Sequence, residues 1–121
     1  MKASRPDEHL LVEASELVLV SAGDPGSPPH EARLRFAYDD GAVHLLAHKD
    51  ADWYRNVARD QGVVVRIRQR GFRGRARLPD ARQRAHAIDH IGALFRRKYG
   101  AGALKGIDPN ALLPVIIDIQ F

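Results

Sequence analysis

A histidine and a lysine stand where a predicted strand gives way to a predicted helix, and this junction has the chemistry of an anion site. Residues 42–47 have the composition of a strand and residues 50–60 that of a short helix. The first turn of a helix offers unpaired N–H groups and the positive end of the dipole, which together favour phosphate or carboxylate. Lys49 adds a mobile ammonium at this point and His48 a second donor. In the competing interpretation, Asp50 and Asp52 satisfy the same N–H groups themselves.

Alternating arginines mark the next two predicted strands, residues 62–69 and 72–78. The arginines occupy every second position on each side of the turn: Arg66, Arg68, Arg70, Arg73, Arg75 and Arg77. A two-residue turn at Arg70-Gly71 would pair Arg66 with Arg75 and place the arginines on one face. Facing like charges repel, which predicts acidic side chains, a second subunit or a phosphorylated ligand nearby. The alternative is an ordinary solvated face.

Two histidines on the longest predicted helix, residues 81–99, have the spacing of a metal-chelating pair. His86 and His90 are one turn apart. They lie near Arg82 and Arg97, away from the apolar stripe of the helix, and no third ligand is evident. The sequence therefore favours a solvated helix face, and no metal is expected.

The elements that would position these residues are short strands with tight connections. A helix is predicted to start at Ser4, and a turn at residues 39–41 should join two strands as a hairpin. The last strand contains Pro114, which predicts an edge or a first-residue position for it. Besides the two arginine-rich segments, strands are predicted at residues 16–21, 33–38, 42–47 and 112–119. Six antiparallel strands with two or three helices favour a small closed or partly closed barrel.

Bulk composition narrows the classes of protein. The 121 residues fit one domain, residues 1–121, and a 45% hydrophobic content is ordinary for a folded chain. With no cysteine, disulfides, thiolate metal sites and a cysteine nucleophile are excluded. No signal peptide and no apolar run long enough for a membrane span is found, so a cytoplasmic protein is expected. The net charge of +4 favours anionic partners, although arginine-rich composition also follows G+C-rich codon usage.

Three short motifs resemble a known family. They are His48-Lys49 after a strand, the run Trp53-Tyr54-Arg55-Asn56-Val57, and the valine-rich segment 63–67. Together they resemble the deazaflavin-dependent nitroreductases, which belong to the FMN-binding split β-barrels related to pyridoxamine 5'-phosphate oxidase. The resemblance extends to Tyr99 and to residues 113–116, and covers most of residues 16–120.

The resemblance implies a mainly β protein with helices, a six-stranded antiparallel split β-barrel that forms a homodimer. It also implies a bound FMN or deazaflavin coenzyme F-420, between which the motifs do not distinguish. By resemblance, His48 and Lys49 contact the cofactor, while Trp53, Tyr54 and Asn56 shape the helix beneath it. The implied activity is hydride transfer between the cofactor and a small organic acceptor, in which the protein orients the cofactor ring. No catalytic residue is assigned.

Two departures from the family pattern keep other functions open. The loop at residues 23–27 contains Asp24 where the family carries a basic phosphate cradle, and Arg33 and Arg35 are candidates to replace that charge. Most tyrosines that follow the long helix in nitroreductases are absent. One alternative is a split barrel that binds or sequesters a ligand without turnover. A further one is nucleic-acid binding by the arginine hairpin, which is least favoured because Phe72 is its only aromatic.

Overall fold

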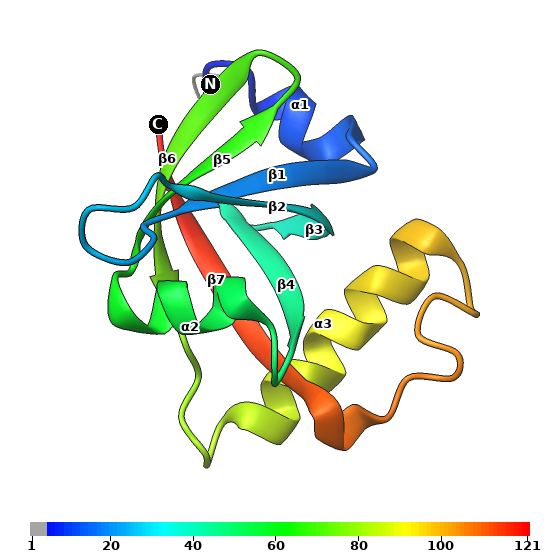
Figure 1. Ribbon diagram of the computed structural model, residues 1–121. Helices are drawn as coiled ribbons and strands as arrows, with labels where there is room; N and C mark the ends of the chain where they lie inside the picture. Colours follow the sequence, from blue (N-terminus) through cyan, green and yellow to red (C-terminus); the bar gives the residue numbers. More distant parts are fainter. Residues whose placement is uncertain (1–4) are drawn as a thin grey trace.

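Seven antiparallel strands form one sheet whose two outer strands are joined end to end in the chain. The computed structural model describes residues 5–121, and Figure 1 shows the sheet curling on itself. Its interior is filled by buried apolar side chains. The strands follow the spatial order β2-β1-β5-β6-β7-β4-β3. Their bounds are β1 Glu16–Ser21, β2 His30–Arg35, β3 Ala37–Asp39, β4 Ala42–His48, β5 Gly62–Ile67, β6 Arg70–Arg77 and β7 Leu112–Gln120. The helices are α1 Glu8–Glu13, α2 Asp52–Arg59 and α3 Arg84–Tyr99, with a 3₁₀ turn η1 at Pro109–Ala111.

The single strand predicted over residues 33–38 is two strands, which corrects the count from six to seven. β2 pairs with β1 and β3 with β4, so the strands leave Phe36 toward opposite ends of the sheet order. The Phe36 N–H does not join a strand ladder. It donates a hydrogen bond to the Tyr99 hydroxyl of α3 at 3.0 Å. Its side chain is fully buried. Phe36 is therefore the corner at which the chain passes from one edge of the barrel wall to the other.

The N-terminal helix begins later than predicted, at Glu8, with Asp7 at its capping position. The proposed capping residue Ser4 lies outside the described residues. Leu11 of α1 is fully buried in the main apolar cluster, and Leu10 and Ala14 pack against it. The hairpin turn between β3 and β4 is confirmed: Asp40 and Gly41 both have positive φ, as a two-residue hairpin of this hand requires.

The arginine hairpin turns two residues earlier than predicted. Arg68 takes the left-handed conformation with φ of 56°, and Arg66 lies opposite Gly71, not opposite Arg75. On the inward face of β6, a Cβ on Gly74 would lie 2.5 Å from a methyl carbon of Ile117 on β7, so this position favours glycine. The predicted faces are nevertheless confirmed along β6, where arginines at 73, 75 and 77 are exposed and the residues between them are buried.

The long helix α3 covers one side of the barrel and starts three residues later than predicted. The Asp80 carboxylate accepts the N–H groups of Arg82 and Gln83, and this turn precedes the helix. Ile91, Leu94 and Phe95 form the buried stripe, which packs on β3, β4 and β7. The helix ends at Gly100, whose φ of 105° suits only glycine.

The final strand β7 is central, so the edge position that Pro114 allowed is wrong, whereas its predicted place near the start of the strand is confirmed. It lies between β6 and β4. The pairing of β6 with β7 does not extend past Arg77 and Ile116 toward the start of β7. At Pro114, the side of β7 that faces β6 therefore has no strand partner. The missing N–H of Pro114 therefore breaks no bond to β6. Within the described residues, no helix is both long and apolar enough to cross a membrane.

Candidate functional site

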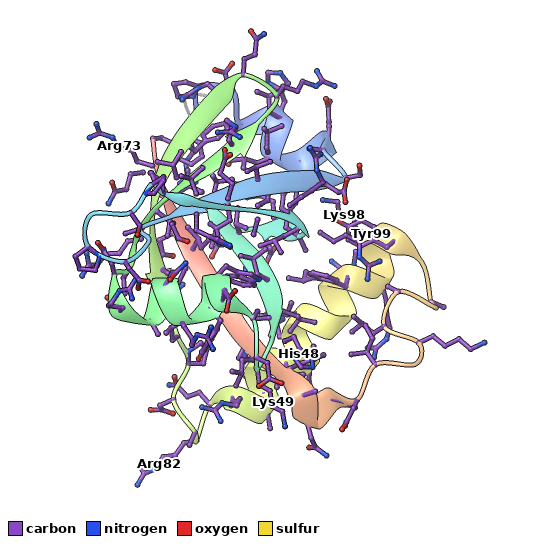
Figure 2. The ribbon with its side chains drawn as sticks, in the orientation of Figure 1. His48, Lys49, Arg73, Arg82, Lys98 and Tyr99 are labelled. Atoms are coloured by element: carbon purple, nitrogen blue, oxygen red, sulfur yellow. The ribbon has the colours of Figure 1, made fainter. Side chains whose placement is uncertain are left out.

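The β4–α2 junction presents His48 and Lys49 at the surface, as the sequence predicts. The Lys49 N–H donates to the Ala111 carbonyl oxygen at 2.9 Å, which ties the junction to η1. Nδ1 of His48 accepts a hydrogen bond from the Asp50 N–H at 3.2 Å, so Nε2 is the ring nitrogen free to donate. Figure 2 shows both side chains at the end of β4. Among the described residues, the Lys49 ammonium has no carboxylate within ion-pair distance.

No side chain caps the first turn of α2, which corrects the expectation that Asp50 does so. Ala51 occupies the capping position, and neither Asp50 nor Asp52 accepts a capping hydrogen bond. The Asp52 carboxylate pairs instead with the Arg55 guanidinium. The first N–H groups of α2 therefore have no side-chain acceptor. They lie close to Lys49 in the chain, and N–H groups of a helix start beside a lysine suit an anion.

Trp53 lies in the core and not at the surface of this site. It is only 6% exposed and, with Val57, forms the buried face of α2. Tyr54 is partly buried, and its ring meets that of Trp53 edge to face with centroids 6.5 Å apart. Trp53 can therefore shape the helix beneath a ligand, while direct contact with that ligand would need Tyr54 or the junction residues.

Asn56 faces a different hollow, between α2 and the loop that follows β1. Its Oδ1 accepts a hydrogen bond from Arg59 at 3.3 Å. Arg59 also pairs with the Asp24 carboxylate at 3.0 Å and donates to the Ala22 carbonyl oxygen. The acidic loop is thus held against α2 by an arginine of the same chain, and the positive charge there is already matched by Asp24.

The two arginines proposed to replace the lost charge lie on β2. Arg33 is exposed and reaches Glu16 at 4.0 Å. Arg35 stacks over the Tyr99 ring, with 4.9 Å from its central carbon to the ring centroid, and donates to the Ala103 carbonyl oxygen. Neither contacts His48 or Lys49, so within one copy of the chain the predicted cofactor residues form separate groups.

Sequence reasoning missed a lysine beside Tyr99. Lys98 Nζ donates to the Phe36 carbonyl oxygen at 2.9 Å and lies 3.6 Å from the centroid of the Phe36 ring. Burial lowers the pKa of this lysine to about 8. Burial also raises the pKa of the Tyr99 hydroxyl. Figure 2 shows both residues at the end of α3, near β2 and β3. No motif marks Lys98, because its burial depends on the corner at Phe36.

Lys98 should make stability rise with pH in alkaline solution. Below about pH 8 both the folded and the unfolded chain carry a protonated lysine, and the folded chain bears the cost of burying the charge. Between pH 8 and 10.5 the unfolded chain binds more protons, so the free energy of unfolding increases with pH. Urea unfolding of the wild type and of Lys98→Met at several pH values measures this. We expect the wild type to gain stability relative to the variant across that range, whereas parallel curves would contradict the assignment.

Two of the outward arginines of β5 and β6 are matched by acidic residues, whereas Arg75 bonds to Gln61 and Arg73 has no acidic partner among the described residues. Arg66 pairs with Glu31, and Arg77 makes two hydrogen bonds to Asp118, which raises the pKa of its guanidinium. The nearby anions that the sequence predicted thus include side chains of the same chain. Phe72, the hairpin aromatic, is buried.

Comparison of the fold with solved structures gives close matches at low identity. A putative pyridoxamine 5'-phosphate oxidase from Listeria innocua has a TM-score of 0.67 and 19% identity over 94% of this chain and 90% of the other. An F-420 reductase has 0.69 and 16%, over 98% and 97%. A FAD-binding protein from Mesorhizobium loti has 0.68 and 19%, over 94% and 87%. The chain has the split-barrel fold of these proteins.

The split-barrel fold accounts for the architecture without assigning the chemistry. No protein-family model matches the sequence. No curated protein matches it either. At identities of 16–19% the likeness concerns the backbone, so the function has to be argued from the residues of this chain.

Proposed function

We propose that this split-barrel protein binds a flavin or deazaflavin cofactor, FMN or F-420, and transfers a hydride between it and a small organic acceptor. The observation that carries the proposal is the β4–α2 junction. Three features meet there, directly before and at the start of α2. They are the unpaired ammonium of Lys49, the donor nitrogen of His48, and a helix start that no side chain caps. The fold likeness to an F-420 reductase and to a FAD-binding protein supports the same class of cofactor.

The residues at the junction fit the phosphate end of such a cofactor. Lys49 would supply charge, His48 Nε2 one hydrogen bond, and the first N–H groups of α2 further hydrogen bonds. When bound, the cofactor supplies the hydride chemistry, and the protein has to hold and orient it. Trp53 and Val57 anchor α2 in the core and thereby fix the direction of its first turn.

A homodimer is part of the proposal. Arg33, Arg35 and Asn56 do not converge on Lys49 within one copy, and Asn56 and Arg33 line two separate hollows of the single chain. A second copy placed against this junction would enclose a ligand that one copy leaves exposed. Size measurement by light scattering at several concentrations tests this part on its own.

Cofactor binding is expected to depend on Lys49. The test is titration of the protein with FMN and with F-420, with the fluorescence of Trp53, the only tryptophan, as the signal. Loss of one charge-assisted hydrogen bond is worth about 1.5–3 kcal/mol, so Lys49→Ala should weaken binding roughly 10- to 150-fold. Lys105→Ala removes an exposed lysine from the loop after α3 and is the matched control, which should bind as the wild type does. If neither cofactor gives saturable binding, the proposed function is wrong.

One observation favours a second function, in which the chain binds the cofactor without turnover. Asp24 occupies the loop and takes up the charge of Arg59, so this loop does not add a basic second grip. Cofactor that binds but is not turned over by any reductant or acceptor would support this alternative. Catalytic reduction of an acceptor would exclude it. Nucleic-acid binding is not proposed, because Phe72, the only aromatic of the hairpin, is buried and three of the six arginines, Arg66, Arg70 and Arg77, pair with acidic residues.

A further inference from the structure

A histidine inside the barrel wall meets a second histidine and an aspartate from two other elements. His44 lies on β4, Asp39 at the end of β3, and His90 on α3. One potential ligand atom from each residue lies within 4.8 Å of the other two. The chain thus assembles two imidazoles and one carboxylate at a point that no motif in the sequence indicates.

His44 has few other interactions to occupy its ring. The residue is 7% exposed, and its Nδ1 is buried without a hydrogen-bond partner among the described residues. Its Nε2 makes only a long contact, 3.4 Å, with the Asp39 carbonyl oxygen. Neither ring nitrogen of His44 is thus held by a strong hydrogen bond, which leaves this buried imidazole available to bind a cation.

The other two ligands can adjust to His44. Nε2 of His90 is 3.9 Å from the Asp39 carboxylate, and both side chains are about half exposed, at 52% and 48%. Bonds of about 2.0–2.2 Å to one ion bring tetrahedral ligand atoms to about 3.3–3.6 Å apart. The three ligand atoms lie up to 4.8 Å apart, so each would have to move by about 1 Å to bind one ion. The exposed side chains of Asp39 and His90 can make such shifts by rotation about their χ angles.

We propose that Asp39, His44 and His90 bind one divalent transition-metal ion of the zinc class. The ion would join the β3–β4 hairpin to α3. Nitrogen and carboxylate ligands in this combination are those of zinc sites with three protein ligands, which leave a fourth position for water or a small anion. His90 also lines the hollow of about 550 Å³ that contains Arg77 and His86, so the fourth position would face this hollow.

The structure separates this site from the chelating pair that the sequence suggests. His86 is one turn from His90 and lines the same hollow, but it is not among the three residues whose ligand atoms come together. The charge of Arg77, which acts on His44, opposes a cation, but Arg77 is paired with Asp118. The His44–Asp39–His90 site and a surface His86–His90 pair therefore make opposite predictions for two variants.

The test is titration of the 121-residue chain, without a histidine tag, with Zn²⁺ by calorimetry and with Co²⁺ by visible absorption. We expect one ion per chain. Asp39→Asn and His90→Ala should each weaken binding at least tenfold, and His86→Ala should change it less than threefold. Zn²⁺ should also raise the melting temperature of the wild type and of His86→Ala, because an ion that binds only the folded chain stabilises it, but not that of Asp39→Asn. His9→Ala, on the exposed face of α1, controls for loss of a histidine elsewhere.

Two outcomes would overturn the site. Equal losses in His86→Ala and His90→Ala, with Asp39→Asn unaffected, would assign the ion to the exposed pair on α3. The absence of saturable one-to-one binding would show that the three residues hold no metal. Asp39→Asn is preferred to a substitution of His44, because it keeps the backbone carbonyl that contacts His44 and removes no buried side chain.

Discussion

Replacing Phe36 with alanine is expected to lower the free energy of unfolding by about 3–5 kcal/mol, the range found for a fully buried phenylalanine. Phe36 is 0% exposed and stands at the corner between β2 and β3. Its ring also packs under the Lys98 ammonium. The variant would therefore lose packing in the interior and a contact with α3 in one step.

Urea unfolding followed by circular dichroism measures this loss. Phe121→Ala is the control, because it truncates the same side chain at a position that is 44% exposed, and it should cost no more than about 1 kcal/mol. Similar losses in the two variants would mean that the corner carries no special share of the stability.

Trp53→Ala is expected to cost about 3–5 kcal/mol as well, whereas Trp53→Phe should cost about 1–2 kcal/mol. Trp53 fills the space between α2 and the sheet, with Val57 beside it. Phenylalanine keeps part of that volume and the apolar character, so the folded state should survive with α2 in place.

The same variant separates a packing role from a contact with the cofactor. Because Trp53 is 6% exposed, folded Trp53→Phe should bind FMN or F-420 within about threefold of the wild-type affinity. Equilibrium dialysis gives this affinity without tryptophan fluorescence. A tenfold loss in a variant that remains folded would place the indole against the cofactor and would contradict the core assignment.

The parts of the fold that could be predicted are those that local sequence determines. β1 follows from its β-branched run, β4 from the hairpin turn before it, and the buried face of α2 from the spacing of Trp53 and Val57. The register of the arginine hairpin could not be predicted, because a period of two is unchanged when the pairing shifts by an even number of residues. The observed pairing of Ile67 with Arg70 places the two-residue turn at Arg68 and Gln69, which the alternating pattern does not distinguish from a turn at Arg70 and Gly71.

The candidate sites divide in the same way. His48 and Lys49 are neighbours in the chain, so their position at a strand–helix junction could be predicted from the sequence. Asp39, His44 and His90 come together only because α3 packs on β3 and β4. The division of residues 33–38 at Phe36 likewise depends on Lys98 and Tyr99, which are distant in the sequence.

The charges of β2 have an effect beyond any ligand. β2 is an outer strand, paired only with β1, and its other side presents unbonded backbone groups. Glu31, Arg33 and Arg35 alternate along it and are exposed. An open strand edge is a template on which another chain can add a strand, and charged side chains on it oppose such pairing. The arginines of β2 thus help protect the folded protein from aggregation, whether or not they ever meet a phosphate.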